Sequence, residues 1–153
     1  DAFVGVDVIV GFPGETEADF DAAYRFLAER IRPAFLHIFP YSVRPGTPAA
    51  ELPDRVSPQE AARRVERLGE LSARLHGAFY DRFVGSVRPV LFESTVREGQ
   101  MVGFTDNYIR VAMPYRSEVV NRIVAVELGE GRTTSSGYAG GEECLSGRPL
   151  EIE

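Results

Sequence analysis

The sequence lacks several residue types on which whole classes of protein depend. Its 153 residues include one cysteine, two histidines, no tryptophan and no lysine, so that all 17 basic side chains are arginines. A single cysteine excludes a disulfide framework, and it excludes a cysteine-held metal or iron–sulfur site formed by this chain alone. No apolar run reaches the roughly 18 residues of a membrane-spanning helix, and we expect no membrane partner.

The charge is unevenly distributed along the chain. The formal net charge of −6 argues against nucleic-acid binding that is purely electrostatic. Residues 1–54 carry a net −5 and residues 129–153 a net −3, whereas residues 55–84 carry +2 and residues 85–128 are neutral. The middle of the chain is therefore free to approach a polyanion.

Residues 1–84 have the pattern of an α/β fold. Residues 3–10 and 34–39 are nearly all apolar, which predicts strands of a parallel sheet that are buried on both faces. Apolar residues at helical spacing predict one amphipathic helix over 17–31 and a long second helix over 58–84. Strand, helix and strand in this order form a right-handed crossover unit.

The predicted α/β layer is incomplete, because two strands cannot close a barrel and apolar strands need neighbours on both sides. The simplest account is that residues 1–84 are the end of a larger α/β domain. The alternative is a compact two-layer domain that shelters both strands against its own helices.

The hydrophobic period changes from helical to alternating after Gly85. Short strands separated by turn residues predict a small antiparallel barrel over 85–128. The last 25 residues contain six glycines and a Thr-Thr-Ser-Ser run, which predicts a flexible tail over 129–153. The predicted strands cover 87–96, 101–105, 108–113 and 119–128.

Three segments carry a resemblance to a known family. Residues 7–16 (DVIVGFPGET) closely resemble a late strand and turn of the radical S-adenosylmethionine methylthiotransferases. Residues 37–49 (HIFPYSVRPGTPA) resemble the next strand and loop of that family. Residues 103–111 (GFTDNYIRV) look like the signature of its carboxy-terminal TRAM domain, a small RNA-binding β-barrel. The segments occur in the family's order, and the resemblance covers about residues 1–128.

The resemblance implies a fold and an activity. The fold would be the carboxy-terminal part of a radical S-adenosylmethionine (β/α) partial barrel, followed by an antiparallel TRAM-type β-barrel. The second segment is most similar to the MtaB-type branch, which adds a methylthio group to C2 of threonylcarbamoyladenosine beside the tRNA anticodon. The MiaB-type branch, which acts on isopentenyladenosine, shares the Tyr-Ser and Arg-Pro-Gly-Thr elements but usually lacks the His-x-Phe-Pro beginning. The ribosomal-protein branch tends to carry Glu at the position of Arg44.

The chain departs from this family in its cysteines. Family members use S-adenosylmethionine and hold two 4Fe-4S clusters on cysteines, whereas Cys144 is alone here. We therefore expect a fragment that ligates neither cluster, has no catalytic residue and is inactive by itself. Its partners would be the missing amino-terminal part of the same enzyme and the tRNA anticodon stem-loop, in the cytoplasm.

The first segment ends in a turn that opens a helix, where backbone N–H groups can face an anion. The resemblance implies that this turn lines the S-adenosylmethionine pocket. Alternatively, its glycines and proline only make a tight connection between strand and helix. The predicted cofactor-binding residues are Gly11, Phe12, Pro13, Gly14 and Glu15.

The second segment supplies the predicted substrate-binding residues His37, Tyr41, Ser42 and Arg44. His37 shares a strand face with Phe35 and Phe39 and would point toward the substrate, although a lone strand histidine is more often structural. Arg44 follows the carboxyl end of a parallel strand, where α/β proteins bind ligands. It would pair with the carboxylate of the threonylcarbamoyl group, or it is a solvated loop arginine.

The third segment supplies the predicted RNA-binding residues Asn107, Tyr108 and Arg110. Alternation assigns Ile109, Val111 and Met113 to the barrel core, which leaves Tyr108 and Arg110 exposed to stack on bases and pair with phosphates. Phe104 belongs either to this surface or to the core. Two other classes of function remain open, namely a stand-alone RNA-binding module and a protein-association unit that uses exposed strand edges.

Overall fold

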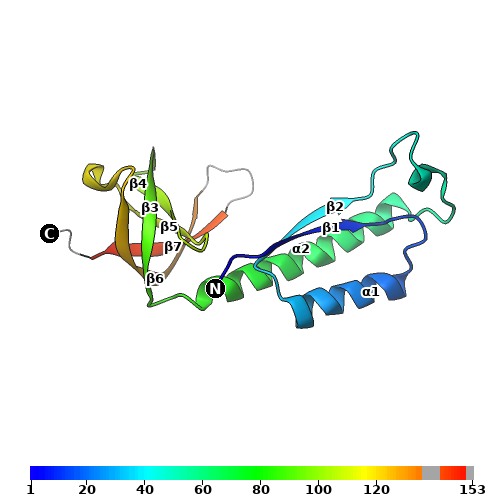
Figure 1. Cartoon of the computed structure of the whole chain (residues 1–153), viewed down its shortest axis with the longest axis horizontal. Coiled ribbons are helices and arrows are strands. Elements are labelled where there is room, and N and C mark those ends of the chain that lie inside the picture. Colours follow the sequence, from blue (N-terminus) through cyan, green and yellow to red (C-terminus); the bar gives the residue numbers. More distant parts are fainter. Residues whose placement is uncertain (136–141, 151–153) are drawn as a thin grey trace. The chain divides into compact units, whose positions relative to one another are not determined.

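The structure is a computed structural model that describes residues 1–135 and 142–150. The chain divides into two compact units (Figure 1). Residues Val4–Ala78 form the α/β unit, and Asp1–Phe3 together with Phe79–Glu153 form the barrel unit. No helix in the described ranges is both long enough and apolar enough to cross a membrane.

The α/β unit contains two parallel strands joined by a helical crossover, as predicted. Strand β1 (Gly5–Val10) pairs with β2 (Phe35–Pro40) in a register that sets Asp7 opposite His37 and Ile9 opposite Phe39. Helix α1 (Glu17–Arg25) begins with a capping box in which Thr16 and Asp19 exchange hydrogen bonds, and it continues as a π-helical segment, η1 (Phe26–Ile31). The long helix α2 (Pro58–Asp81) and a short 3₁₀ turn, η2 (Pro48–Glu51), follow β2.

Both helices cover the same face of the two-stranded sheet. The core joins Val10 and Leu36 of the strands to Phe20 and Leu27 of the α1–η1 segment and to side chains of α2. Ser72 of α2 also accepts the backbone N–H of Leu36 through its hydroxyl at 3.0 Å, which satisfies a donor of β2.

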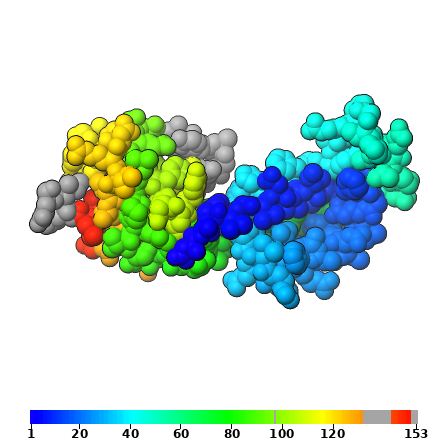
Figure 2. Space-filling model, in the orientation of Figure 1, coloured from blue at the N-terminus to red at the C-terminus, as the bar shows by residue number. Residues whose placement is uncertain are grey.

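The prediction that both strands are buried on both faces is wrong for this chain. Because α1 and α2 lie on one side, alternate strand residues remain uncovered, and Ile9 and Phe39 are 61% and 50% exposed. β1 is visible along the surface in Figure 2.

The barrel unit contains five strands in a closed barrel with the order β3-β4-β5-β7-β6. Its interior is filled by side chains such as Phe92, Met101, Ile109, Val111 and Leu128, all fully buried. Ile109, Val111 and Met113 point inward as the alternation predicted. The strands are β3 (Val87–Arg97), β4 (Gln100–Thr105), β5 (Arg110–Pro114), β6 (Ile123–Ser135) and β7 (Glu142–Pro149), with a 3₁₀ turn, η3 (Ser117–Val119), before β6.

The prediction of a flexible tail over 129–153 is wrong where the structure describes it, because β6 extends to Ser135 and β7 completes the barrel. Glycine here serves close packing: a β-carbon at Gly147 would lie 2.5 Å from Cγ1 of Val111. Cys144 and Leu145 of β7 are fully buried. Residues 136–141 and 151–153 lie outside the described residues.

The purely antiparallel barrel is also corrected, since β5 and β7 pair in parallel while the other strand pairs are antiparallel. The boundary between the units lies at Ala78/Phe79, whereas the sequence placed it at 84/85. The last turn of α2 belongs to the barrel unit because its side chains bind there: the Tyr80 hydroxyl accepts the N–H of Arg110, and Phe79 packs edge-on against Phe3.

Candidate functional site

The uncovered side of the two-stranded sheet is the first element of the candidate site. Since side chains alternate along a strand, it is formed by every second residue of each strand, and we call it the open face. Its members are Gly5, Asp7 and Ile9 of β1 and Phe35, His37 and Phe39 of β2.

His37 lies exposed at the centre of the open face, where the sequence placed it. Its ring packs edge-on against Phe35, with ring centroids 4.8 Å apart. Gly5 lies beside this ring, and a β-carbon at position 5 would make an ordinary van der Waals contact, 3.9 Å from Nε2 of His37. Asp7, the register partner of His37, is also exposed. The face therefore presents a carboxylate and an imidazole between apolar side chains.

A pocket of about 430 Å³ lies at the carboxyl end of the open face. Ile9 and Phe39 of the strands form part of its wall, and the loop after β2, which stands out from the unit in Figures 1 and 2, forms the rest. The structure brings three of the predicted substrate-binding residues together here. The lining consists of Ile9, Phe39, Pro40, Tyr41, Ser42, Arg44, Thr47 and Ala49.

The polar groups of this pocket have distinct surroundings. The backbone N–H of Tyr41 donates to Val10 at 2.8 Å, which ties the loop to the end of β1. The Tyr41 hydroxyl is buried and has no hydrogen-bond partner among the described residues. Arg44 is exposed, and its backbone carbonyl accepts the Thr47 hydroxyl at 2.8 Å. The pocket thus offers one cation and one unsatisfied hydroxyl on a mainly apolar wall.

Three backbone N–H groups of the predicted cofactor turn, Gly11 to Glu15, are occupied by acceptors of the chain itself. The N–H of Gly11 donates to the carboxylate of Glu15, the N–H of Gly14 donates to Asp54 at 2.9 Å, and the N–H of Glu15 donates to Phe12 at 2.9 Å. These donors are therefore not free for an anion. Gly11 and Pro13 are buried, Glu15 is half-buried, and Phe12 and Gly14 are exposed.

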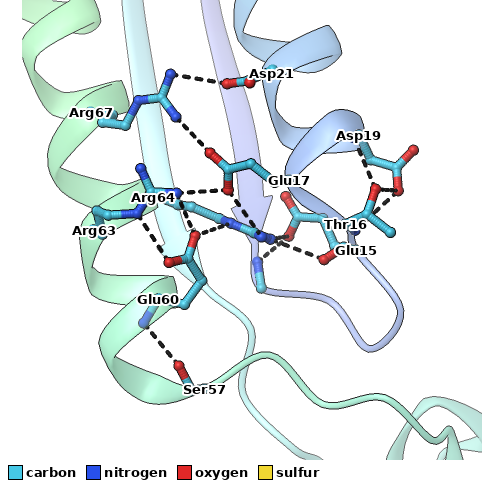
Figure 3. A network of polar contacts seen from close by, with 11 residues as sticks. Glu15, Thr16, Glu17, Asp19, Asp21, Ser57, Glu60, Arg63, Arg64 and Arg67 are labelled. Carbon is cyan, nitrogen blue, oxygen red and sulfur yellow. Dashed lines mark hydrogen bonds and ion pairs between the residues drawn. The ribbon is translucent and has the colours of Figure 1, made fainter.

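A charged network behind this turn joins α1 to α2 (Figure 3). Arg63 and Arg67 pair with Glu17, and Arg67 also pairs with Asp21 at 3.0 Å. Hydrogen bonds from Arg63 and Arg64 lower the pKa of Glu60 to about 2. The sequence analysis did not identify this network, although acids in the first turn of one helix and arginines in another are a recognisable signal.

The chain does not fit the iron–sulfur clusters that the family uses. Within residues 1–135 and 142–150, no group of three His, Cys, Asp or Glu side chains is placed to hold a metal ion. Cys144 is buried inside the barrel, and a cluster needs several thiolates that converge on iron.

The barrel unit carries the remaining predicted residues. Tyr108 is 69% exposed, and its ring centroid lies 6.0 Å from that of Phe104. The guanidinium of Arg110 lies over the Phe104 ring at 5.1 Å, a cation–π geometry. We call Phe104, Tyr108 and Arg110 the aromatic patch.

Arg110, which the sequence predicted to be exposed, is half-buried, as is Phe104. Asn107 is buried more deeply, with 7% of its surface exposed. Its side-chain oxygen accepts the Thr105 hydroxyl at 2.7 Å, and its amide donates to the carbonyl of Asp1 at 3.3 Å. These contacts give Asn107 a structural role in the turn before β5.

The comparisons with known proteins agree with the resemblance in the sequence. No protein-family model matches the chain. Threonylcarbamoyladenosine tRNA methylthiotransferase MtaB of Bacillus subtilis is 40% identical over 126 residues, which is 80% of this chain and 28% of that protein. The tRNA-2-methylthio-N(6)-dimethylallyladenosine synthases of Methylobacillus flagellatus and a Jannaschia species are 40% identical over 132 and 136 residues, covering 85% and 88% of this chain.

These relatives are much longer than this chain, which spans 28–30% of their length. Over most of its own length, the chain is therefore homologous to the methylthiotransferases.

Proposed function

We propose that this methylthiotransferase homologue is the carboxy-terminal part of an enzyme that adds a methylthio group to C2 of threonylcarbamoyladenosine beside the tRNA anticodon. The observation that carries the proposal is the pocket that continues the open face at the carboxyl ends of two parallel strands. Ligand sites of α/β sheets lie at this edge. The choice of substrate rests on the likeness of residues 37–49 to the MtaB-type branch, because relatives of both branches are 40% identical to this chain.

In the longer enzyme, the α/β unit would be the last section of a radical S-adenosylmethionine partial barrel. The open face, with Ile9 and Phe39 exposed, would then form part of its inner wall. A carboxylate and an imidazole between apolar side chains suit a heterocyclic base, since they offer hydrogen bonds to its edge and apolar contact to its ring.

The pocket lining favours a substituent that carries a negative charge. Arg44 would pair with the carboxylate of the threonylcarbamoyl group, and the Tyr41 hydroxyl would donate to one of its oxygens. The apolar part of the wall would hold the rest of the modified base. His37 would contact the base from the open face.

Radical generation belongs to S-adenosylmethionine and the clusters, whose ligands this chain does not supply. Because the N–H groups of Gly11, Gly14 and Glu15 are occupied within the chain, we assign the turn a different part. The exposed ring of Phe12 would border the cofactor site, and the turn would fix its position.

The barrel would act as a TRAM-type RNA-binding domain. The aromatic patch offers the exposed ring of Tyr108 beside a half-buried ring and a half-buried cation, and rings with cations bind unpaired nucleotides by stacking and phosphate contact. Tyr108 and Arg110 would therefore hold the anticodon stem-loop.

A second candidate is the isopentenyladenosine-type reaction, because two of the relatives carry the dimethylallyladenosine name and much of the pocket wall is apolar. A third is a stand-alone RNA-binding module, which the closed barrel and its aromatic patch favour.

Titration of the chain with the two free nucleosides, followed by NMR, separates the first two candidates. We expect threonylcarbamoyladenosine to shift the signals of residues that line the pocket, and we expect Arg44→Gln to weaken this binding about tenfold, as loss of a charge-assisted pair does. Arg30→Gln, which removes an exposed arginine of η1, is the matched control. Tighter binding of isopentenyladenosine, unaffected by Arg44→Gln, would favour the second candidate.

A further inference from the structure

The most deeply buried arginine of the charged network lies behind the Gly11–Glu15 turn. Arg64 of α2 is 3% exposed. Its guanidinium lies 3.0 Å from the carboxylate of Glu60, 3.2 Å from that of Glu15 and 3.5 Å from that of Glu17. It also donates to the backbone carbonyl of Glu15 at 3.2 Å (Figure 3). Arg64 thus reaches both the side chain and the backbone of Glu15.

This arrangement fixes the guanidinium in one place. A buried cation is destabilising unless its donors are paired, and here acceptors from the turn, from α1 and from α2 surround it. The planar group satisfies several acceptors at set angles, which the single ammonium of lysine does not reproduce.

Arg64 differs from its neighbours in what it holds. Arg63 pairs with Glu17 and Glu60, and Arg67 pairs with Glu17 and Asp21, so both join the helices at their exposed rim. Of the three arginines, only Arg64 contacts Glu15 within the described part of the chain.

Glu15 passes this constraint to the turn. Its carboxylate accepts the N–H of Gly11, and it is the same oxygen, Oε2, that faces Arg64. Gly11 has a φ of +77°, and a β-carbon there would lie 3.1 Å from Cβ of Ala61 on α2. The turn is therefore closed on itself and pressed against the helix that carries Arg64.

The Gly11–Glu15 turn also contacts the pocket. Phe12 projects from it and packs edge-on against Tyr41, with ring centroids 5.2 Å apart and ring planes at 72°. Tyr41 lines the pocket and carries the unsatisfied hydroxyl. A continuous set of contacts therefore leads from Arg64 through Glu15, the turn and Phe12 to the pocket wall.

We infer that Arg64 is a positioning residue for the pocket: it holds Glu15 and the turn so that Phe12 fixes the ring of Tyr41. Arg64 touches no ligand in this arrangement. The identity of the ligand rests on the proposed function, whereas the positioning itself does not.

The test compares Arg64→Gln, Glu15→Gln and the double variant with Arg63→Gln in the full chain. Arg63 is the matched control because it shares Glu17 and Glu60 with Arg64 but does not contact Glu15. The first readout is the NMR signals of the Phe12 and Tyr41 rings without ligand, and the second is the affinity for threonylcarbamoyladenosine.

We expect Arg64→Gln and Glu15→Gln each to shift both ring signals and to weaken nucleoside binding about tenfold, with no further loss in the double variant, because residues of one network are not additive. Arg63→Gln should change neither readout. A merely stabilising arginine would lower the midpoint of unfolding and leave the ring signals of the folded chain in place.

Unmoved ring signals in folded Arg64→Gln, or losses that add in the double variant, would overturn the inference. If Arg64→Gln does not fold, Glu15→Gln decides, since it leaves the pairs of Arg64 with Glu17 and Glu60 intact. A parent chain that does not bind the nucleoside removes support from the proposed function, and the ring signals still decide the role of Arg64.

Discussion

The two sheets of this molecule differ in how completely their strand edges are paired and their faces are covered. The five strands of the barrel form a closed ring of pairs around a fully buried interior. The two strands of the α/β unit have helices on one side only, and their other side exposes Ile9 and Phe39. Closure removes sheet edges and stabilises a barrel by itself. The open sheet leaves apolar and ionisable side chains accessible to a ligand, which is why we propose that the modified base binds there.

The largest difference in stability is expected when one phenylalanine is removed from each sheet. Phe92→Ala deletes a ring that is fully buried in the barrel and should cost about 3–5 kcal/mol. Phe39→Ala deletes an exposed ring from the open face and should change the free energy of unfolding by less than about 0.5 kcal/mol. Urea denaturation of both variants checks the difference. Equal losses would mean that the open face is not open in solution.

A smaller effect is expected from adding a single methyl group to the barrel. A β-carbon at Gly103 would lie 2.6 Å from the backbone carbonyl of Leu91, which cannot move away as a side chain does. Gly103→Ala should therefore destabilise the barrel by about 1–3 kcal/mol. Gly69→Ala is the control, because nothing lies within 4 Å of that site on α2. There the change should stabilise by about 0.5–1 kcal/mol, and thermal unfolding measures both.

Substitutions on the barrel surface should change the affinity for RNA and leave the stability of the fold unchanged. Tyr108→Asn removes the exposed ring of the aromatic patch while keeping a residue that tolerates its φ of 63°. We expect the Kd for an anticodon stem-loop to rise about tenfold, since stacking contributes roughly 1–3 kcal/mol per base. Tyr115→Asn, at another exposed tyrosine, should leave the Kd unchanged in filter binding at the same salt concentration. Equal losses in the two variants would move the RNA contact away from the patch.

The smallest expected effect is on the pH dependence of stability, through the charged network behind the turn. Hydrogen bonds from Arg63 and Arg64 lower the pKa of Glu60 from 4.5 to about 2. Because the folded pKa is the lower one, the ionised pair stabilises the fold fully above pH 4.5 and loses this effect as the pH falls toward 2. Glu60→Gln should flatten the pH dependence of stability in that window. A curve that is as steep as that of the parent would exclude Glu60 as its source.

The sequence was sufficient for features that depend on local periodicity. Apolar spacing correctly predicted the crossover of β1, α1 and β2, the long helix α2, and the inward direction of Ile109, Val111 and Met113. Each of these follows from contacts between residues that are near in sequence or from a repeated pattern along one element.

The sequence did not predict features that depend on residues far apart in the chain. Gly147 was among the glycines that suggested flexibility, and only the approach of Val111 shows that it permits close packing in a barrel strand. Asn107 was expected at the RNA surface, but its partners Thr105 and Asp1 make it structural. The buried position of Arg64 depends on the packing of α2 against the turn, which no local pattern specifies.

Among the candidate site residues, Tyr41, Ser42 and Arg44 do line one pocket, and His37 lies on the open face beside it. Motif resemblance located these residues because the loop follows its strand directly. It did not show that the donors of the Gly11–Glu15 turn are occupied, because their acceptors are Glu15 and Phe12 of the turn itself and Asp54 from a distant segment.

The buried thiol of Cys144 has a practical consequence. It is the one cysteine of the sequence, and it lies inside the barrel with no exposed surface. Thiol reagents need a solvent-accessible sulfur, so alkylation of the native protein would wait for β7 to open. The rate of labelling thus measures local opening of the barrel. Because the α/β unit has no cysteine, its opening does not contribute to this rate.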